Sequence, residues 1–368
     1  MTTQQIGKRI RAIREERGLS QESLAEMFGF NDRQTVSAIE TGVRRITAQE
    51  LVLAVERLGT SLEYFTDPFL LAGEGRFSWR QSGIEVQQLE AYERKAGRWI
   101  GAFRALAPQV GREAPLMRRA LGLVRRSGFE EAMHAGERFV AEIGLGDVPA
   151  VSLADAMERE LGILVLMVDG HRGISGAACR LPQLNTVLIA RREVEGRRHF
   201  DLAHELFHLL TWDAIPPDHL EKARDTGGNC VEQLANNFAG AVLMPADTVA
   251  RYADWSELEQ AGLIANLNAA ADALHVTASA LKWRLVALGA LTLAAARAIP
   301  DCALRHNGRE EVENAPPALF SRTFMETIGL AIGDGLLSVR RAAALLDLSV
   351  DDLSDLFEEH GIEQPVEL

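Results

Sequence analysis

The sequence predicts a mainly α, multi-domain protein in which an α+β domain is flanked by helical units. Its 368 residues exceed what one hydrophobic core usually supports, and 47% hydrophobic content is enough for several cores. Apolar residues recur three and four positions apart through most of the chain, whereas 163–190 holds short runs rich in aliphatic residues. We therefore expect four parts: a helical domain at 1–66, a linker and helical segment at 67–145, an α+β domain at 146–296 and a helical domain at 297–368.

The first part has the pattern of a small helical bundle. Ser20 and Thr47 stand where helix N-caps are expected, and Gly18, Gly29 and Gly42 where helices end. Two short helices joined by a tight turn in such a bundle form a helix-turn-helix. The segment resembles the phage-repressor (Cro/CI, or XRE) type of DNA-binding domain in the motifs Leu19-Ser20-Gln21 and Val36-Ser37-x-Ile39-Glu40-x-Gly42.

DNA contacts are expected mainly on the exposed face of the third helix of this part. Arginine and glutamine suit base edges, and further polar and basic groups can hold phosphates. The candidates are Gln21, Arg33, Gln34, Thr35, Ser37, Arg44 and Arg45. Residues 1–66 carry nine basic and nine acidic side chains, and the whole chain has a net charge of −13. We therefore expect a homodimer that reads a paired operator, with a protein-interaction module as the alternative.

The segment His204-Glu205-Leu206-Phe207-His208 has the spacing of a zinc hydrolase. Two histidines at i and i+4 share one helix face, so both rings can reach one cation. The glutamate between them can act as a base on metal-activated water. In a second predicted helix, Glu232 can complete the ligand set, and Asn236 shares its face. Two histidines and a glutamate leave a fourth position for water, which is typical of catalytic zinc sites.

Both blocks together resemble the ImmA/IrrE family of metallo-endopeptidases. The matching residues are Phe200, Ala203-His204-Glu205-Leu206-x-His208, Glu232-x-x-Ala235-Asn236-x-Phe238-Ala239 and Leu243-Met244-Pro245. The resemblance implies a gluzincin-like site with one Zn²⁺ per chain, with His204, His208 and Glu232 as ligands and Glu205 as general base. It also implies cleavage of a regulatory protein, typically a DNA-binding repressor, in stress responses, mobile elements or toxin–antitoxin systems. Phe207 and Asp201 depart from the glycine and threonine that are common there.

Three predicted strands, at 163–168, 173–179 and 186–190, precede this active-site helix. With the amphipathic helix before them they predict a minimal zincin domain with a small three-stranded sheet. An extended peptide substrate could pair with an exposed edge, formed by the second or the third strand.

The oxyanion-stabilising group is left open among His199, Tyr252 and His219. Asn236 is a further candidate for supporting the site. Asp201 can orient the ring of His204 or cap the helix.

The remaining features limit the class of protein. The chain lacks an apolar run long enough to span a membrane, and its polar start does not have the pattern of a signal peptide. Three scattered cysteines form no disulfide framework, which favours a cytoplasmic protein. A glycine-rich phosphate loop is missing, which argues against nucleotide-dependent activity. The acidic final helix of 297–368 predicts packing or dimerisation rather than DNA binding.

Two functions of different class follow from these observations. In the first, a zinc endopeptidase is brought by its DNA-binding domain to a repressor at the operator, or regulates its own gene. In the second, a transcriptional regulator carries a peptidase-like domain that only senses a ligand or metal or mediates an interaction. The intact ligand set and the intact Glu205 favour the first.

Overall fold

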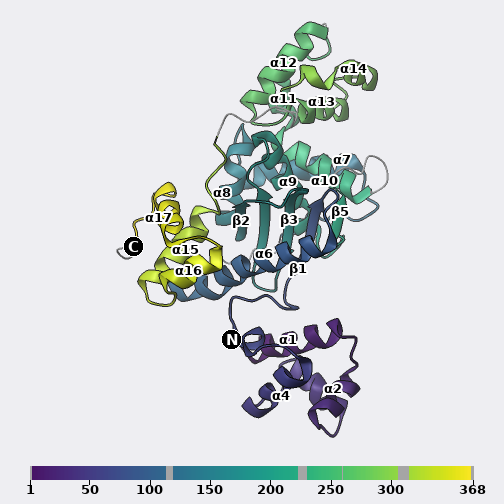
Figure 1. Ribbon diagram of the computed structural model, residues 1–368. Helices are drawn as coiled ribbons and strands as arrows, with labels where there is room; N and C mark the ends of the chain where they lie inside the picture. Colours follow the sequence, from purple (N-terminus) through teal and green to yellow (C-terminus); the bar gives the residue numbers. More distant parts are fainter. Residues whose placement is uncertain (1, 113–118, 223–229, 259, 306–314, 366–368) are drawn as a thin grey trace.

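The computed structural model describes residues 2–112, 119–222, 230–258, 260–305 and 315–365. A bundle of short helices forms one end, a mixed sheet between two helical layers forms the centre, and further helices extend beyond it (Figure 1). The predicted mainly α, multi-domain fold with a small α+β unit is therefore confirmed. In the part of the chain that the structure describes, no helix combines the length and the apolar character that crossing a membrane requires.

The N-terminal bundle has the predicted helices and caps. Its core is apolar and contains Ile10, Leu24 and Val36. The side chain of Ser20 accepts a hydrogen bond from the Ser23 amide, and Gly29 ends the next helix at φ 70°. The helices are α1 (Thr3–Glu16), α2 (Gln21–Phe28), α3 (Arg33–Glu40), α4 (Ala48–Leu58) and α5 (Leu62–Thr66).

The central sheet has five strands where the sequence predicted three. The predicted strands are present as β2 (Ile163–Val168), β3 (Ile174–Arg180) and β4 (Asn185–Ala190). They are joined by β1 (Arg76–Gln81) and β5 (Leu220–Lys222) in the order β2-β4-β3-β1-β5. Strand β3 is antiparallel to both β1 and β4, whereas β2 pairs with β4 and β5 with β1 in parallel. The sequence analysis assigned β1 to a linker, and β5 is too short to give a pattern.

The two faces of the sheet are covered by different helices because side chains alternate along each strand. On β2, Ile163 and Val165 face one core, and Leu164 and Leu166 face the other. The first core is closed by α7 (Phe129–Ile143), α8 (Pro149–Leu161), α9 (Glu195–Thr211) and α10 (Cys230–Leu243). The second is closed by α6 (Val86–Leu106), α15 (Arg322–Gly333), α16 (Val339–Leu346) and α17 (Val350–Glu359), with the 3-10 turn η1 (Ala107–Val110) after α6.

The remaining helices follow α10 and extend from the central unit (Figure 1). They are α11 (Ala246–Ala250), α12 (Gln260–Ala273), α13 (Ala278–Ala287) and α14 (Leu293–Ala298), followed by the short η2 (Asp301–Ala303). The hydrophobic cores run across the boundaries predicted at 145 and 296, since Phe139 packs with the first core and Phe324 with the second. The four-part division stays a prediction.

A buried carboxylate joins the N-terminal bundle to the central unit. Glu74 accepts hydrogen bonds from Arg9 on α1 and from Arg104 on α6, and all three side chains are nearly inaccessible to solvent. Beside it, Gly73 has φ 66°, and a Cβ atom there would lie 2.5 Å from that of Ala12. The chain then enters β1 directly, so the junction lies at the start of the central sheet.

Candidate metal centre and nucleic-acid interface

Helix α9 carries two histidines and a glutamate into the first core. His204, Glu205 and His208 have no solvent exposure, since the helix lies between the sheet and α10. The close packing begins at Gly196, where a Cβ atom would lie 2.4 Å from the carbonyl carbon of Val276. Ionisable groups in such a position are costly unless they have partners or bind a ligand.

Helix α10 brings Glu232 to the two imidazoles, and their ligand atoms form a cage of the size that zinc requires. The Nε2 atoms of His204 and His208 are 3.1 Å apart, and the Glu232 carboxylate oxygens lie 3.3 Å and 3.5 Å from them. Two atoms bonded to a tetrahedral zinc at its usual bond length lie about 3.3 Å apart. These three residues therefore form a group that can hold one metal ion.

The protonation states in the site suit metal binding. Burial lowers the pKa of His208 to about 3 and that of His204 well below its ordinary value, so both rings are neutral at pH 7. The Nδ1 atom of His204 lies 3.0 Å from Oδ1 of Asn236, one turn beyond Glu232 on α10. An N–H donated from Nδ1 leaves the Nε2 lone pair facing the other ligands. This contact suits an imidazole that binds a metal through Nε2.

Asp201 is held by arginines and does not cap its helix. Helix α9 begins six residues earlier, at Glu195. Burial raises the pKa of Asp201, while the charges of Arg80 and Arg197 act in the opposite direction. Arg80 Nε lies 3.5 Å and Arg197 Nε 4.0 Å from its carboxylate. No sequence pattern links Arg80 to this site, because Arg80 lies on β1, 124 positions before His204.

The expected peptide-binding edge is already paired within the chain. A Cβ atom on Gly176 of β3 would lie 3.5 Å from Cγ of Glu205, so β3 passes directly over this glutamate. The other side of β3 pairs antiparallel with β1, and β4 lies between β2 and β3. The expectation that β3 or β4 offers a free edge is therefore wrong, because β1 pairs where a substrate strand would add.

The three oxyanion candidates from the sequence lie in different surroundings. Nδ1 of His199 is 2.8 Å from the carbonyl oxygen of His275, before α13. His219 is exposed and lies 2.7 Å from the carboxylate of Glu93 on α6. Tyr252 follows α11 and is 37% exposed. None of these contacts directs a donor to the ligand cage.

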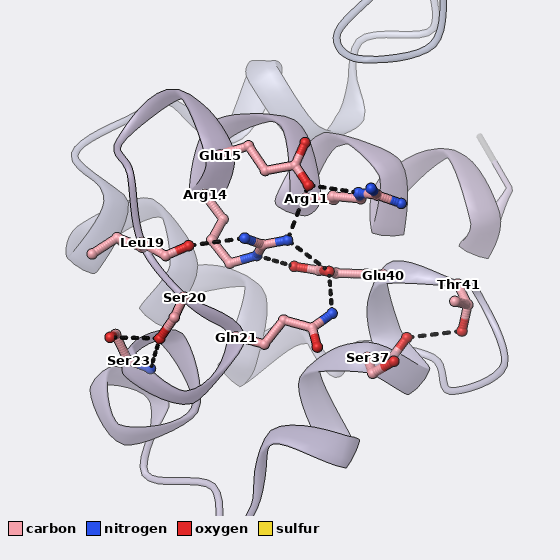
Figure 2. A network of polar contacts seen from close by, with 10 residues as sticks. All are labelled: Arg11, Arg14, Glu15, Leu19, Ser20, Gln21, Ser23, Ser37, Glu40 and Thr41. Atoms are coloured by element: carbon pink, nitrogen blue, oxygen red, sulfur yellow. Dashed lines mark hydrogen bonds and ion pairs between the residues drawn. The ribbon is translucent and has the colours of Figure 1, made fainter.

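On α3, Arg33 and Gln34 are exposed, and Thr35 and Ser37 are partly buried. Gln21 is less free, because its amide donates to Glu40, which is also bound by the buried Arg14 (Figure 2). This network connects α1, α2 and α3, and it gives Gln21 an internal partner.

Of the two basic candidates after α3, one has an internal partner and the other is exposed. Arg44 forms two hydrogen bonds to Glu50, at 2.7 Å and 3.1 Å, and lies over the ring of Phe30. Arg45 is exposed. An exposed arginine can turn to a phosphate without losing a partner.

Family comparisons match the N-terminal bundle and the central part of the chain. Residues 10–65 match the family described as Helix-turn-helix, and residues 158–286 match Peptidase_M78, the IrrE N-terminal-like domain. The predicted combination of an XRE-type helix-turn-helix with an ImmA/IrrE-like domain is therefore confirmed.

One curated relative is named HTH-type transcriptional regulator PrpR, from Mycobacterium tuberculosis (strain ATCC 25618 / H37Rv). It is 27% identical over 280 residues, which cover 65% of this chain and 56% of the relative. The chain thus matches little more than half of that protein's length. No solved structure matches the chain.

Proposed function

We propose that this chain, which joins a helix-turn-helix domain to an IrrE N-terminal-like domain, is a DNA-binding zinc endopeptidase that cleaves a regulatory protein. The observation that carries the proposal is the cage formed by His204, His208 and Glu232 with Glu205 beside it. Because three ligands leave a fourth position for water, this set suits catalysis better than a purely structural role.

Different residues of the chain would have different roles in hydrolysis. Zinc bound by His204, His208 and Glu232 would act as a Lewis acid, which would acidify a water and polarise a carbonyl group. Glu205, one position after His204 and close to Gly176 of β3, would take a proton from that water and deliver it to the leaving amine. Asn236 keeps the Nε2 atom of His204 directed at the metal.

The substrate class is supported by the domain combination. The N-terminal unit matches a DNA-binding fold, so two copies on a paired operator would bring the peptidase to proteins bound on the same DNA. A repressor at that operator is the substrate we propose, and Arg33, Gln34 and Arg45 are the exposed groups that would contact DNA.

The experiment compares the wild type with Glu205→Gln. Each is co-expressed with repressor-class proteins encoded beside its gene, and new protein termini are mapped by mass spectrometry. We expect shortened repressor only with the wild type, although both proteins bind one zinc per chain. Identical termini in both samples would show that Glu205 is not the base of a peptidase.

A second candidate function is a transcriptional regulator with a non-cleaving domain. It is favoured by the pairing of β1 with β3, which takes the place of a substrate strand, and by the regulator named among the relatives. The burial of Phe77 and Trp79 on β1 makes this strand costly to displace. Under this alternative neither protein shortens a repressor, whereas zinc changes DNA binding.

A further inference from the structure

Strand β1 delivers an arginine to the metal centre from outside the matched peptidase-like segment. Phe77 and Trp79 point into the second core, so the alternating Ser78 and Arg80 point to the face covered by α9. In the β1–β3 pairing, Arg80 stands directly opposite Gly176, which lies over Glu205. The guanidinium therefore enters the space beside the catalytic helix.

One nitrogen of this guanidinium, Nη1, has no hydrogen-bond partner in the described part of the chain. Arg80 is 11% exposed, and its Nε is 3.5 Å from Asp201. Its Nη1 atom is buried and makes no hydrogen bond among the residues that the structure describes. A buried charged donor without an acceptor is costly, and such donors commonly bind a ligand. Asp201 lies on α9, three positions before His204, so Arg80 contacts the helix that carries both histidines.

We propose that Arg80 is the anion-holding residue of this metal centre, which binds an anionic oxygen of a ligand that also occupies the open position on the metal. A guanidinium presents parallel N–H donors that match a carboxylate, and a preorganised donor of this kind also stabilises the oxyanion formed during amide hydrolysis. The inference rests on the proposed metal site but does not require that the protein cleaves peptides.

This role separates Arg80 from the three oxyanion candidates that the sequence suggested. His199 contacts His275 and His219 contacts Glu93. Arg80 instead contacts Asp201 on α9, the helix that carries His204 and His208. Arg80 follows Glu74 by six positions, so the anion-holding group comes from the strand that starts at the DNA-binding junction.

The test uses Co²⁺-substituted full-length protein and acetate as the probe, read by the visible absorption of the metal. We expect acetate to change the wild-type spectrum saturably, and Arg80→Gln to bind it at least about tenfold more weakly with unchanged cobalt content. The acetate affinity of Arg80→Lys should lie between those of the wild type and Arg80→Gln, because lysine keeps the positive charge but lacks the paired N–H donors of the guanidinium. Arg76→Gln, an exposed position on the same strand, is the control and should behave as the wild type.

Three results would overturn the proposal: a wild type that takes up no cobalt, a wild type that does not respond to acetate, or equal acetate affinity in Arg80→Gln. If Arg80→Gln does not fold, Arg80→Met is measured in its place, and equal affinity there has the same meaning.

A peptide-cleavage assay then distinguishes the two possible sources of the anionic oxygen, which are a carboxylate ligand and the oxyanion formed during amide hydrolysis. For an oxyanion formed from the substrate, Arg80→Gln lowers kcat and leaves KM nearly unchanged. If the wild type binds acetate but does not cleave peptides, the result supports a site for small carboxylates. The same result contradicts the proposed peptidase activity.

Discussion

Oδ1 of Asn236 lies 3.0 Å from Nδ1 of His204, and this contact sets which nitrogen of the histidine faces the other ligands. The two residues come from different helices, α9 and α10, so the packing of these helices determines the tautomer. A histidine whose second nitrogen is held in this way is a better metal ligand than one that is free to turn.

Asn236→Ala should weaken metal binding by roughly 10- to 100-fold because the acceptor for the His204 N–H is lost. The affinity is measured by zinc competition with a chromophoric chelator. Asn237→Ala is the matched control, since the side chain of Asn237 donates to the Gln233 carbonyl oxygen of its own helix. Equal zinc affinities for the two variants would contradict the role of Asn236.

The metal-free protein should lose stability in acid through its buried histidines. Burial lowers the pKa of His208 from 6.5 to about 3, so the unfolded chain binds more protons than the folded chain between these values. The stabilisation is complete above pH 6.5 and is lost as the pH falls towards 3, by up to about 5 kcal/mol in the free energy of unfolding.

Urea unfolding across this pH range measures the effect. His208→Asn should flatten the pH profile, whereas His219→Asn, at an exposed position, should leave it as in the wild type. A profile for His208→Asn as steep as that of the wild type would assign the acid sensitivity to other groups.

Arg33→Ala combined with Gln34→Ala should abolish sequence-specific DNA binding. Each good bidentate base contact contributes about 1–3 kcal/mol, so affinity for a selected operator should fall by roughly 100-fold or more. Fluorescence anisotropy with an operator selected by the wild type measures the affinity, and zinc content should not change. Arg57→Ala, exposed on α4, is the control. Undiminished operator binding by the double variant would exclude α3 as the recognition helix.

Glu74→Gln should destabilise the junction between the DNA-binding bundle and the central unit. It leaves the charges of Arg9 and Arg104 uncompensated in a buried site, which costs about 3 kcal/mol. Urea unfolding gives the loss, and Glu90→Gln on the exposed side of α6 is the control. The junction would be unimportant for stability if both variants unfolded at the same urea concentration.

The sequence was sufficient where the determining interactions are local. The i, i+4 spacing of His204 and His208 fixes their common face, and the caps at Ser20 and Thr47 satisfy amides three residues away. The strands at 163–190 were recognisable because each is a short apolar run between turns.

Long-range pairing decided the rest, and no local pattern encodes it. Strand β1 pairs with β3 across about a hundred positions, and this pairing removes the free edge and brings Arg80 to Asp201. Asn236 reaches His204 only because α9 and α10 pack together. The types and spacing of the candidate ligand residues were therefore determined by the sequence alone. Only the tertiary structure showed that Asn236 and Arg80 lie beside this site, because contacts between distant segments depend on how whole helices and strands pack.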